Sequence, residues 1–303
     1  MNKEQIKAEI LNRDRAIKVI SKDGMFRAIL IKNSKTTRTA QEKHKVHKDV
    51  AYYFAQVLTG GSMLAALLKG EERVVLSVEG SGIIKSIVGE ALQIGEVRGY
   101  LRLKDDEEKQ LKFEKVEDVF GAGFMRVTKV LYNKAEPVQG IIPLQYGDIV
   151  NDLSYYFFQS EQVPTLIKMD CEFDDEGMIH HSGGIMIQAM PNAKQQDFLA
   201  IYKHLEEIES VASFFESGKT PDESLKYLLP FEYDVLGTTP IDFFCRCSKD
   251  IFKSKLITLD KSELEDMYKV NHNELVCQYC NNHYYLTEDD FKELIAEKTA
   301  VMN

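Results

Sequence analysis

Four of the five cysteines in this 303-residue chain stand in two close pairs near the C-terminus. One residue separates Cys245 from Cys247, and two residues separate Cys277 from Cys280. Two close pairs that lie far apart in sequence can converge on one tetrahedral ion, and zinc is commonly held by four thiolates in such closed sites. The spacing therefore predicts one zinc ion per chain, because four ordinary buried cysteines would rarely fall into this pattern.

Sulfur would fill all four coordination positions, so we expect a structural zinc. A catalytic zinc keeps one position open for water or substrate. His283 follows Cys280 closely and is an alternative ligand, but four thiolates suffice and a packed position beside the site is the expected role. Acidic residues outnumber basic ones from 237 to 303, which argues against a zinc finger that binds nucleic acid.

The same thiols have the features of a redox switch. Metal-bound thiolates are in the deprotonated form that oxidants attack. A disulfide between Cys245 and Cys247 would close a very small ring, and strained bridges are the labile or regulatory ones. Oxidation would release the zinc, and because zinc affinity is also folding free energy, the module would then lose structure.

A helical stretch, residues 192–235, precedes the cysteine module. Its apolar residues recur at alternating steps of three and four, which predicts one long helix that opens at Pro191 and Asn192. A second, shorter helix is predicted to begin at the Thr-Pro-Asp-Glu sequence of 220–223. The stripe is expected to pack in the core of the reduced protein, and it consists of Phe198, Ile201, Leu205, Ile208, Ala212 and Phe215.

The N-terminal part has the alternation and the glycine turns of antiparallel strands. Two runs around the turn at 22–24 predict a hairpin. A helix is predicted at 48–68, where Gly60 and Gly61 would permit close packing, and another at 148–164. Residues 104–118 are densely charged and are expected to form a solvated loop or edge. Further strands are predicted at 74–78, 83–88, 97–101, 124–130, 140–147, 165–173 and 183–191.

These elements predict an α+β fold with three parts. Residues 1–191 would form an N-terminal antiparallel-sheet domain with packed helices. Residues 192–236 would form a helical linker, and residues 237–303 a small C-terminal zinc-binding module.

Composition limits the partners and the location. The net charge of −10 argues against a dedicated nucleic-acid binder, which needs clustered Lys and Arg. The charged N-terminus lacks the apolar segment of a signal peptide, and the apolar run at 62–68 is too short to span a bilayer. We therefore expect a cytoplasmic protein, in which clustered cysteines indicate metal or redox chemistry rather than structural disulfides.

The chain resembles the heat shock protein 33 family of redox-regulated chaperones. The family's Cys-x-Cys and Cys-x-x-Cys signature is matched by FCRCS at 244–248 and CQYCNNHY at 277–284. Segments similar to the family's N-terminal domain occur in family order, so the resemblance covers most of the chain. They are GEVRGY at 95–100, DLSYYFFQSEQVPT at 152–165 and GGIMIQAMPNA at 183–193. Two departures, the absence of a Ser-Pro step at 47–51 and Gly82-Ile83 in place of a Gly-Pro turn, concern the N-terminal domain.

The resemblance implies a holdase that works without ATP and is inactive while reduced and zinc-bound. It implies that oxidation joins Cys245 with Cys247 and Cys277 with Cys280, after which zinc leaves, the linker unfolds and active homodimers form. The implied partners are unfolded or aggregation-prone proteins, and no nucleic acid, membrane or enzymatic role is expected. The candidate client-binding residues are those of the stripe: Phe198, Ile201, Leu205, Ile208 and Phe215.

Two other classes of function compete with this one. A constitutive zinc-stabilised interaction module, without a redox switch, would keep its zinc in the presence of oxidant. An enzyme would need a nucleophile, a base and an orienting group, and no such set can be recognised in the polar pairs at 160–161, 174–175 and 180–181. Cys171 lies outside the signature and is expected to be a small apolar strand residue.

Overall fold

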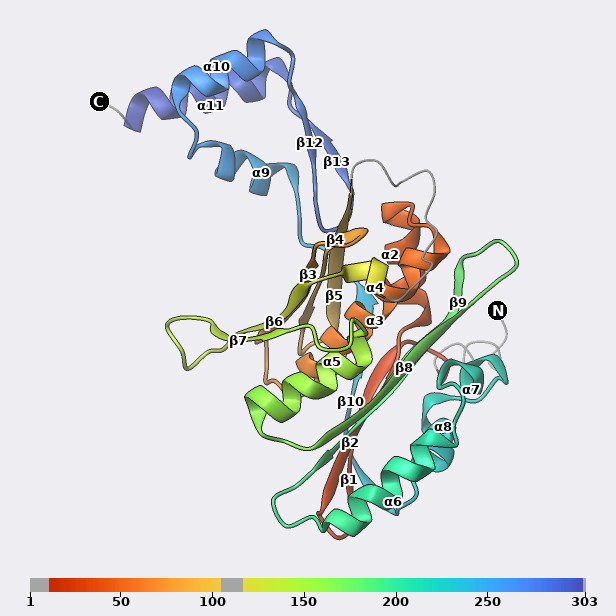
Figure 1. Ribbon diagram of the computed structural model, residues 1–303. Helices are drawn as coiled ribbons and strands as arrows, with labels where there is room; N and C mark the ends of the chain where they lie inside the picture. Colours follow the sequence, from red (N-terminus) through yellow and green to blue (C-terminus); the bar gives the residue numbers. More distant parts are fainter. Residues whose placement is uncertain (1–10, 105–116, 302–303) are drawn as a thin grey trace. The chain divides into compact units, whose positions relative to one another are not determined.

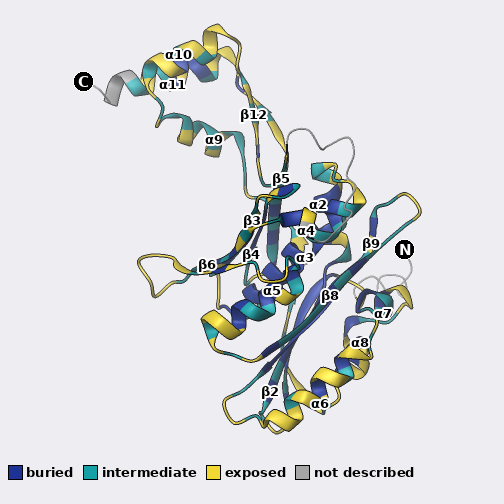
Figure 2. Ribbon diagram, viewed as in Figure 1, coloured by how far each residue is buried: buried dark blue, intermediate teal, exposed yellow. Residues whose placement is uncertain are grey.

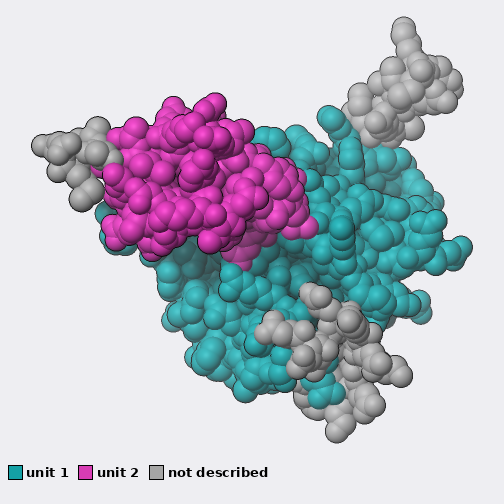
Figure 3. Space-filling model, turned by 90° about the horizontal axis from the view of Figure 1, so that it is seen from above, with its two compact units in different colours: residues 1–244 teal, residues 245–303 magenta. Residues whose placement is uncertain are grey.

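The computed structural model describes residues 11–104 and 117–301 (Figure 1). The chain divides into two compact units, residues 1–244 and 245–303, which Figure 3 colours separately. The charged segment predicted as a loop at 104–118 lies almost entirely outside the described residues. In the described part of the chain, no helix combines the length and the apolar character that crossing a membrane requires.

The first unit contains a five-stranded antiparallel sheet in the order β10-β1-β2-β9-β8. The predicted hairpin at its centre is confirmed, because Arg15 pairs with Lys32 and the turn contains Gly24 at a φ of 73°, which favours glycine. The strands are β1 (Arg15–Ser21), β2 (Phe26–Lys32), β8 (Thr165–Phe173), β9 (Ile179–Ala189) and β10 (Tyr233–Pro240).

A six-stranded sheet in the order β11-β5-β4-β3-β6-β7 forms the other part of this unit. Its neighbours are antiparallel except for the short β11, which runs parallel to β5. The antiparallel sheets and their helices confirm the predicted α+β class. The strands are β3 (Arg73–Gly80), β4 (Ile84–Leu92), β5 (Glu96–Leu103), β6 (Gly123–Val130), β7 (Val138–Pro143) and β11 (Asp242–Phe243).

Helix α3 (Lys48–Ala65) is the central element of the larger core and packs against strands of both sheets. Figure 2 shows how much of it is buried. A Cβ added at Gly60 would lie 3.0 Å from the side chain of Leu153 and 3.1 Å from that of Leu76. The predicted close packing at this glycine is therefore confirmed. The other helices near this core are α2 (Ser34–His44), α4 (Glu117–Phe120), α5 (Ile149–Tyr156) and the π-helical turn η1 (Phe157–Glu161).

Helices α6 (Gln195–Glu206), α7 (Ala212–Glu216) and α8 (Pro221–Leu228) pack with the five-stranded sheet (Figure 1). The prediction of one long helix through the stripe is wrong, since the helix stops after Glu206 and a new one begins at Ala212. The reason is a distant side chain: Asp170 on β8 accepts hydrogen bonds from the N–H groups of Val211 and Ala212 at 2.9 and 2.8 Å. A helix that continued through this point would bond those groups to its own carbonyls.

The shorter helix predicted from Thr220 is confirmed, with a capping box between Thr220 and Glu223. The chain then forms β10, a strand in a stretch where the sequence pattern predicts none. Strand β10 lies at the edge of the sheet beside β1, with an irregular register at Lys18 and Val19. The division into core, linker and switch remains a functional prediction.

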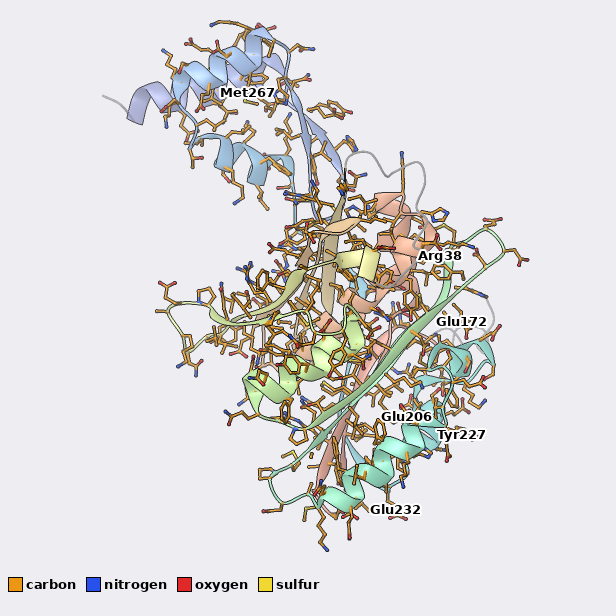
Figure 4. All side chains as sticks on the ribbon, in the orientation of Figure 1. Arg38, Glu172, Glu206, Tyr227, Glu232 and Met267 are labelled. Carbon is orange, nitrogen blue, oxygen red and sulfur yellow. The ribbon has the colours of Figure 1, made fainter. Side chains whose placement is uncertain are left out.

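The second unit is small. Its buried apolar residues include Leu264, Leu286, Phe291 and Leu294. Helix α11 begins as predicted beside Thr287, whose hydroxyl accepts the N–H of Asp290 at 3.3 Å. The elements are α9 (Lys249–Leu256), α10 (Lys261–Lys269, which carries Met267 in Figure 4), β12 (Glu274–Val276), β13 (His283–Tyr285) and α11 (Glu288–Val301).

Candidate metal centre

The four clustered cysteines come together in the second unit, with all four Sγ atoms within 4.8 Å of one another. Two of the separations are 3.7 Å, from Cys245 to Cys277, and 3.3 Å, from Cys247 to Cys280. Thiolates about 2.3 Å from a tetrahedral zinc would be about 3.8 Å apart. A disulfide would require about 2.05 Å, and all four cysteines are free thiols. The donor set and its spacing fit a four-thiolate metal ion.

The second pair lies in the loop that joins β12 to β13. The N–H of Cys277 donates to the carbonyl of Asn282 at 2.9 Å, and the N–H of Asn281 donates to the carbonyl of Cys277 at 2.7 Å. Asn281 has a φ of 55°, a left-handed conformation that asparagine tolerates well. Backbone N–H groups of Tyr279 and Cys280 also point at the Cys277 sulfur. The tight turn thus holds both sulfurs in place and supplies donors to a thiolate.

The first pair lies in the segment that leads into α9. Ser248 follows Cys247 directly and caps this helix, since its hydroxyl accepts the N–H of Ile251 at 3.2 Å. The helix start therefore fixes the backbone next to Cys247. Cys245 and Cys247 are half-buried, whereas Cys277 and Cys280 are buried.

The metal-free thiols differ in acidity. Burial raises the pKa of Cys277 and, more strongly, that of Cys280. Burial acts on Cys247 in the same direction, but hydrogen bonds from Tyr284 and the three other thiols outweigh it and leave the pKa of Cys247 below its ordinary value. A bound divalent cation would hold all four groups as thiolates, because metal ligands must be deprotonated.

Tyr284, which sequence reasoning missed, touches the first pair from β13. Its hydroxyl donates to the carbonyl oxygen of Cys247 at 3.0 Å and lies 3.1 Å from the Cys247 Sγ. Its ring packs against Phe252 of α9 at a centroid distance of 5.5 Å. The spacing of the cysteines contains no signal for this contact, because it depends on how the hairpin meets α9.

His283, the alternative ligand, is not among the residues whose ligand atoms come together at the candidate metal site. Its Nδ1 atom lies 2.7 Å from the carboxylate of Glu274 on the neighbouring strand, and the side chain is exposed. Cys171 belongs to the first unit, where it packs with Ala51, Ala55 and Ile179. Burial raises the pKa of Cys171 to about 12, which keeps this thiol protonated at neutral pH, in keeping with the expected apolar strand residue.

Two of the carboxylates weighed for an enzyme, Glu161 and Asp174, have contacts that serve the fold. Glu161 accepts hydrogen bonds from Lys129 at 2.5 Å and from Tyr156 at 2.6 Å, which fixes η1 against β6. Asp174 closes a turn and accepts a hydrogen bond from Arg38, labelled in Figure 4, at 2.8 Å. These contacts account for both carboxylates as structural groups.

The apolar stripe packs in the second core cluster, as expected for the reduced protein. Ile201, Leu205 and Phe215 are only 4%, 6% and 4% exposed. Phe198 and Ile208 are partly buried against the same cluster. Strands β1, β2 and β9 supply the other side of this interface. Its use as a client-binding surface would require the helices to leave the sheet.

Comparison with known proteins identifies relatives along most of the chain. A family model described as Hsp33 protein matches residues 14–287. The 33 kDa chaperonin of Bacillus velezensis is 32% identical over 290 residues, which cover 94% of this chain and 99% of that protein. The 33 kDa chaperonin of Streptococcus uberis is 32% identical over 288 residues, with 94% and 99% covered. The crystal structure of a 33 kDa chaperonin (heat shock protein 33 homolog) from Thermotoga maritima is similar with a TM-score of 0.85 and 26% identity, covering 95% of this chain and 100% of that one.

Proposed function

The chain belongs to the Hsp33 protein family, and we propose that it is a redox-regulated holdase chaperone. In the reduced state it holds one zinc ion and is inactive. Oxidation releases the zinc and activates binding of unfolding proteins without ATP. The observation that carries the proposal is the group of four cysteine Sγ atoms within 4.8 Å of one another. A cytoplasmic location, where thiols stay reduced until oxidants accumulate, suits such a switch.

Cys245, Cys247, Cys277 and Cys280 would hold the zinc. When bound, zinc keeps the four sulfurs deprotonated and together. A thiolate attacks one oxygen of a peroxide and breaks the O–O bond, which gives a sulfenic acid and, after proton uptake, water. A second thiolate attacks the sulfenic sulfur, forms the S–S bond and expels hydroxide, which also becomes water. Each disulfide thus consumes one peroxide, which accepts two electrons from the two thiolates, and two disulfides leave no thiolate to hold the ion.

The pairing of the thiols decides whether oxidation opens the module. We propose Cys245 with Cys247 and Cys277 with Cys280, the pairing implied by the family resemblance. Each resulting disulfide stays within one segment, so the α9 segment and the β12–β13 hairpin are no longer joined through the metal. Disulfides across the pairs would instead tie the two segments together. Peptide mapping of oxidised protein distinguishes these products.

Loss of zinc should unfold the second unit because little else stabilises it. A domain this small rarely buries enough apolar surface to be stable alone. The structural zinc of small modules contributes an apparent free energy of about 10–16 kcal/mol at neutral pH, which is as large as the roughly 5–15 kcal/mol that stabilises typical domains. Ion pairs of Asp290 with Lys249 and Lys253 join α11 to α9 through partly buried side chains, but their contribution is small beside that of a structural zinc.

Activation requires that unfolding of the second unit reaches the apolar stripe. The chain connects the two through β11 and β10, and β10 lies at an edge of its sheet. An edge strand beside an unfolded segment is a low-stability element. Its loss would leave α8, α7 and α6 attached by their own packing and by polar contacts such as those of Asp170 with Val211 and Ala212. Release of these helices would uncover both the stripe and the apolar sheet face that contains Ile17, Val19 and Ile187, and this uncovered surface would bind clients and a second copy of the chain.

The decisive experiment compares reduced, zinc-loaded protein with peroxide-treated protein in suppressing aggregation of an unfolding client. A colorimetric chelator follows zinc release in parallel, and light scattering follows dimer formation. We expect activity and dimers only after zinc release. Cys171→Ser is the matched control and should behave like the wild type. Equal activity in both states would refute the switch.

A constitutive zinc-stabilised interaction module is the second candidate, favoured by the buried positions of Cys277 and Cys280. Burial limits access of oxidant to these sulfurs. This candidate predicts that the zinc stays bound and the second unit stays folded at peroxide concentrations that oxidise an exposed thiol. The same zinc-release measurement separates the two candidates.

A further inference from the structure

Tyr284 joins the two halves of the cysteine site. The residue lies on β13, directly after the loop that carries Cys277 and Cys280. Its hydroxyl oxygen lies 3.0 Å from the carbonyl oxygen and 3.1 Å from the Sγ of Cys247. The Phe252 ring, which packs beside it, belongs to the helix that begins just after Cys247. One side chain therefore spans the hairpin, the first cysteine pair and α9.

The hydroxyl has one proton and two acceptors of Cys247 within reach, and it also forms a hydrogen bond with the Asn282 side chain. While Cys247 is a thiol, the S–H can donate to the tyrosine oxygen, and the tyrosine can donate to the carbonyl. A metal-bound or deprotonated sulfur has no proton, so a hydrogen bond between these atoms must then be donated by Tyr284. A hydrogen bond to a charged acceptor is about twice as strong as a neutral one. The contact therefore strengthens in the state that holds metal.

We propose that Tyr284 is a positioning residue that sets how tightly the site retains its metal and how readily Cys247 is oxidised. A hydrogen bond donated to a ligand sulfur draws off part of its negative charge, which makes the sulfur less reactive toward an electrophilic oxidant. The same bond keeps Cys247, one of the half-buried ligands, in place for the metal. This inference rests on the proposed zinc site. It identifies the Tyr284 hydroxyl as the group that sets how much oxidant is needed to release the metal.

The neighbouring tyrosine provides a matched control. Successive side chains of a strand point to opposite faces, so Tyr285 faces away from Tyr284. The Tyr285 hydroxyl donates to Glu274 at 2.8 Å, and the side chain is 57% exposed. Tyr285→Phe thus removes the same atom from the same short strand without touching a cysteine.

The test uses full-length, reduced protein loaded with zinc. Zinc affinity is measured by competition with a chromogenic chelator, and the rate of zinc release is measured at a fixed peroxide concentration. Tyr284→Phe should weaken zinc retention by about tenfold, at the low end of the effect of residues that support metal ligands. It should also release zinc several-fold faster under peroxide. Tyr285→Phe should match the wild type in both measurements.

A third variant separates the hydroxyl from the ring. Phe252→Leu loosens the packing of Tyr284 but leaves its hydroxyl, so its effect should be smaller than that of Tyr284→Phe. An equal or larger effect of Phe252→Leu would assign the result to packing and overturn the inference, as would a Tyr284→Phe variant that behaves like Tyr285→Phe. Either of these results overturns only the role of Tyr284, because the proposed function still holds if peroxide activates the wild-type protein. A wild type that binds no zinc overturns both.

Discussion

Asp170 is the polar anchor of the middle helices, and its substitution gives the sharpest prediction about their release. The carboxylate accepts the N–H groups of Val211 and Ala212 at 2.9 and 2.8 Å, and the hydroxyl of Ser210 at 2.9 Å. Ser210 in turn accepts the N–H of Ser213 at 3.0 Å. One charged side chain on β8 thereby starts α7 and fixes it to the sheet.

The size of the effect follows from these bonds. In Asp170→Asn one carboxylate oxygen becomes an NH₂ group, which faces a donor and leaves at least one N–H of α7 unpaired. An unpaired, partly buried donor costs about 1–3 kcal/mol, and loss of a negative charge at a helix start costs about 0.3–1 kcal/mol. A total of about 2 kcal/mol would raise the undocked population of α7 by roughly 30-fold.

Hydrogen exchange measured by mass spectrometry tests this estimate directly. Peptides that cover Val211 to Phe215 should exchange roughly 30-fold faster in Asp170→Asn than in the wild type, because exchange through local opening follows its free energy. Asp175→Asn, in an exposed turn, is the control. Under the proposed function, reduced Asp170→Asn should also suppress client aggregation to some extent. Unchanged protection of α7 would refute the anchoring role.

Three further predictions concern other parts of the chain. Burial raises the pKa of Asp14 from 3.8 to about 6, so the folded protein binds more protons than the unfolded chain between these values, and this residue's contribution to stability falls as the pH rises through them. Asp14→Asn should remove this pH-dependent loss of stability. The free energy of unfolding of variant and wild type, measured across the same pH range, gives the difference. Gly183→Ala should lower stability by about 1–3 kcal/mol in denaturant titration, because the new Cβ would lie 2.4 Å from the Ile31 carbonyl oxygen and 2.6 Å from the Phe215 ring. Cys280→Ser should lose zinc and the folded second unit, seen as a fall in metal content and in helical circular dichroism, whereas retention of one zinc per chain would contradict the four-thiolate site.

The sequence predicted the elements whose signal is local. The hairpin of β1 and β2 alternates around a glycine turn, and the capping box at Thr220 is contained within four residues. The cysteine site also has a local signal, since each half is a close pair of ligands. These patterns need no knowledge of the rest of the chain.

The features that the sequence did not predict depend on distant partners. The break between α6 and α7 is caused by Asp170, 41 residues before Val211. Strand β10 lies at a sheet edge with most of its residues exposed, so it lacks the alternation that identifies a strand. The position of Tyr284 is set by hairpin packing. In each case the deciding contact joins segments whose proximity the sequence does not reveal.

The two interpretations of the apolar stripe are compatible, because they describe different states of the same helices. Phe215 is buried over Gly183, where a larger residue would not fit, so the packed state is specific and not a loose cover. A specific interface can be both tight and switchable if few polar contacts fix one of its helices. Helix α7 is short, and Asp170 supplies its start. The polar part of the energy that holds α7 in the packed state therefore rests largely on the contacts of Asp170 with Ser210, Val211 and Ala212.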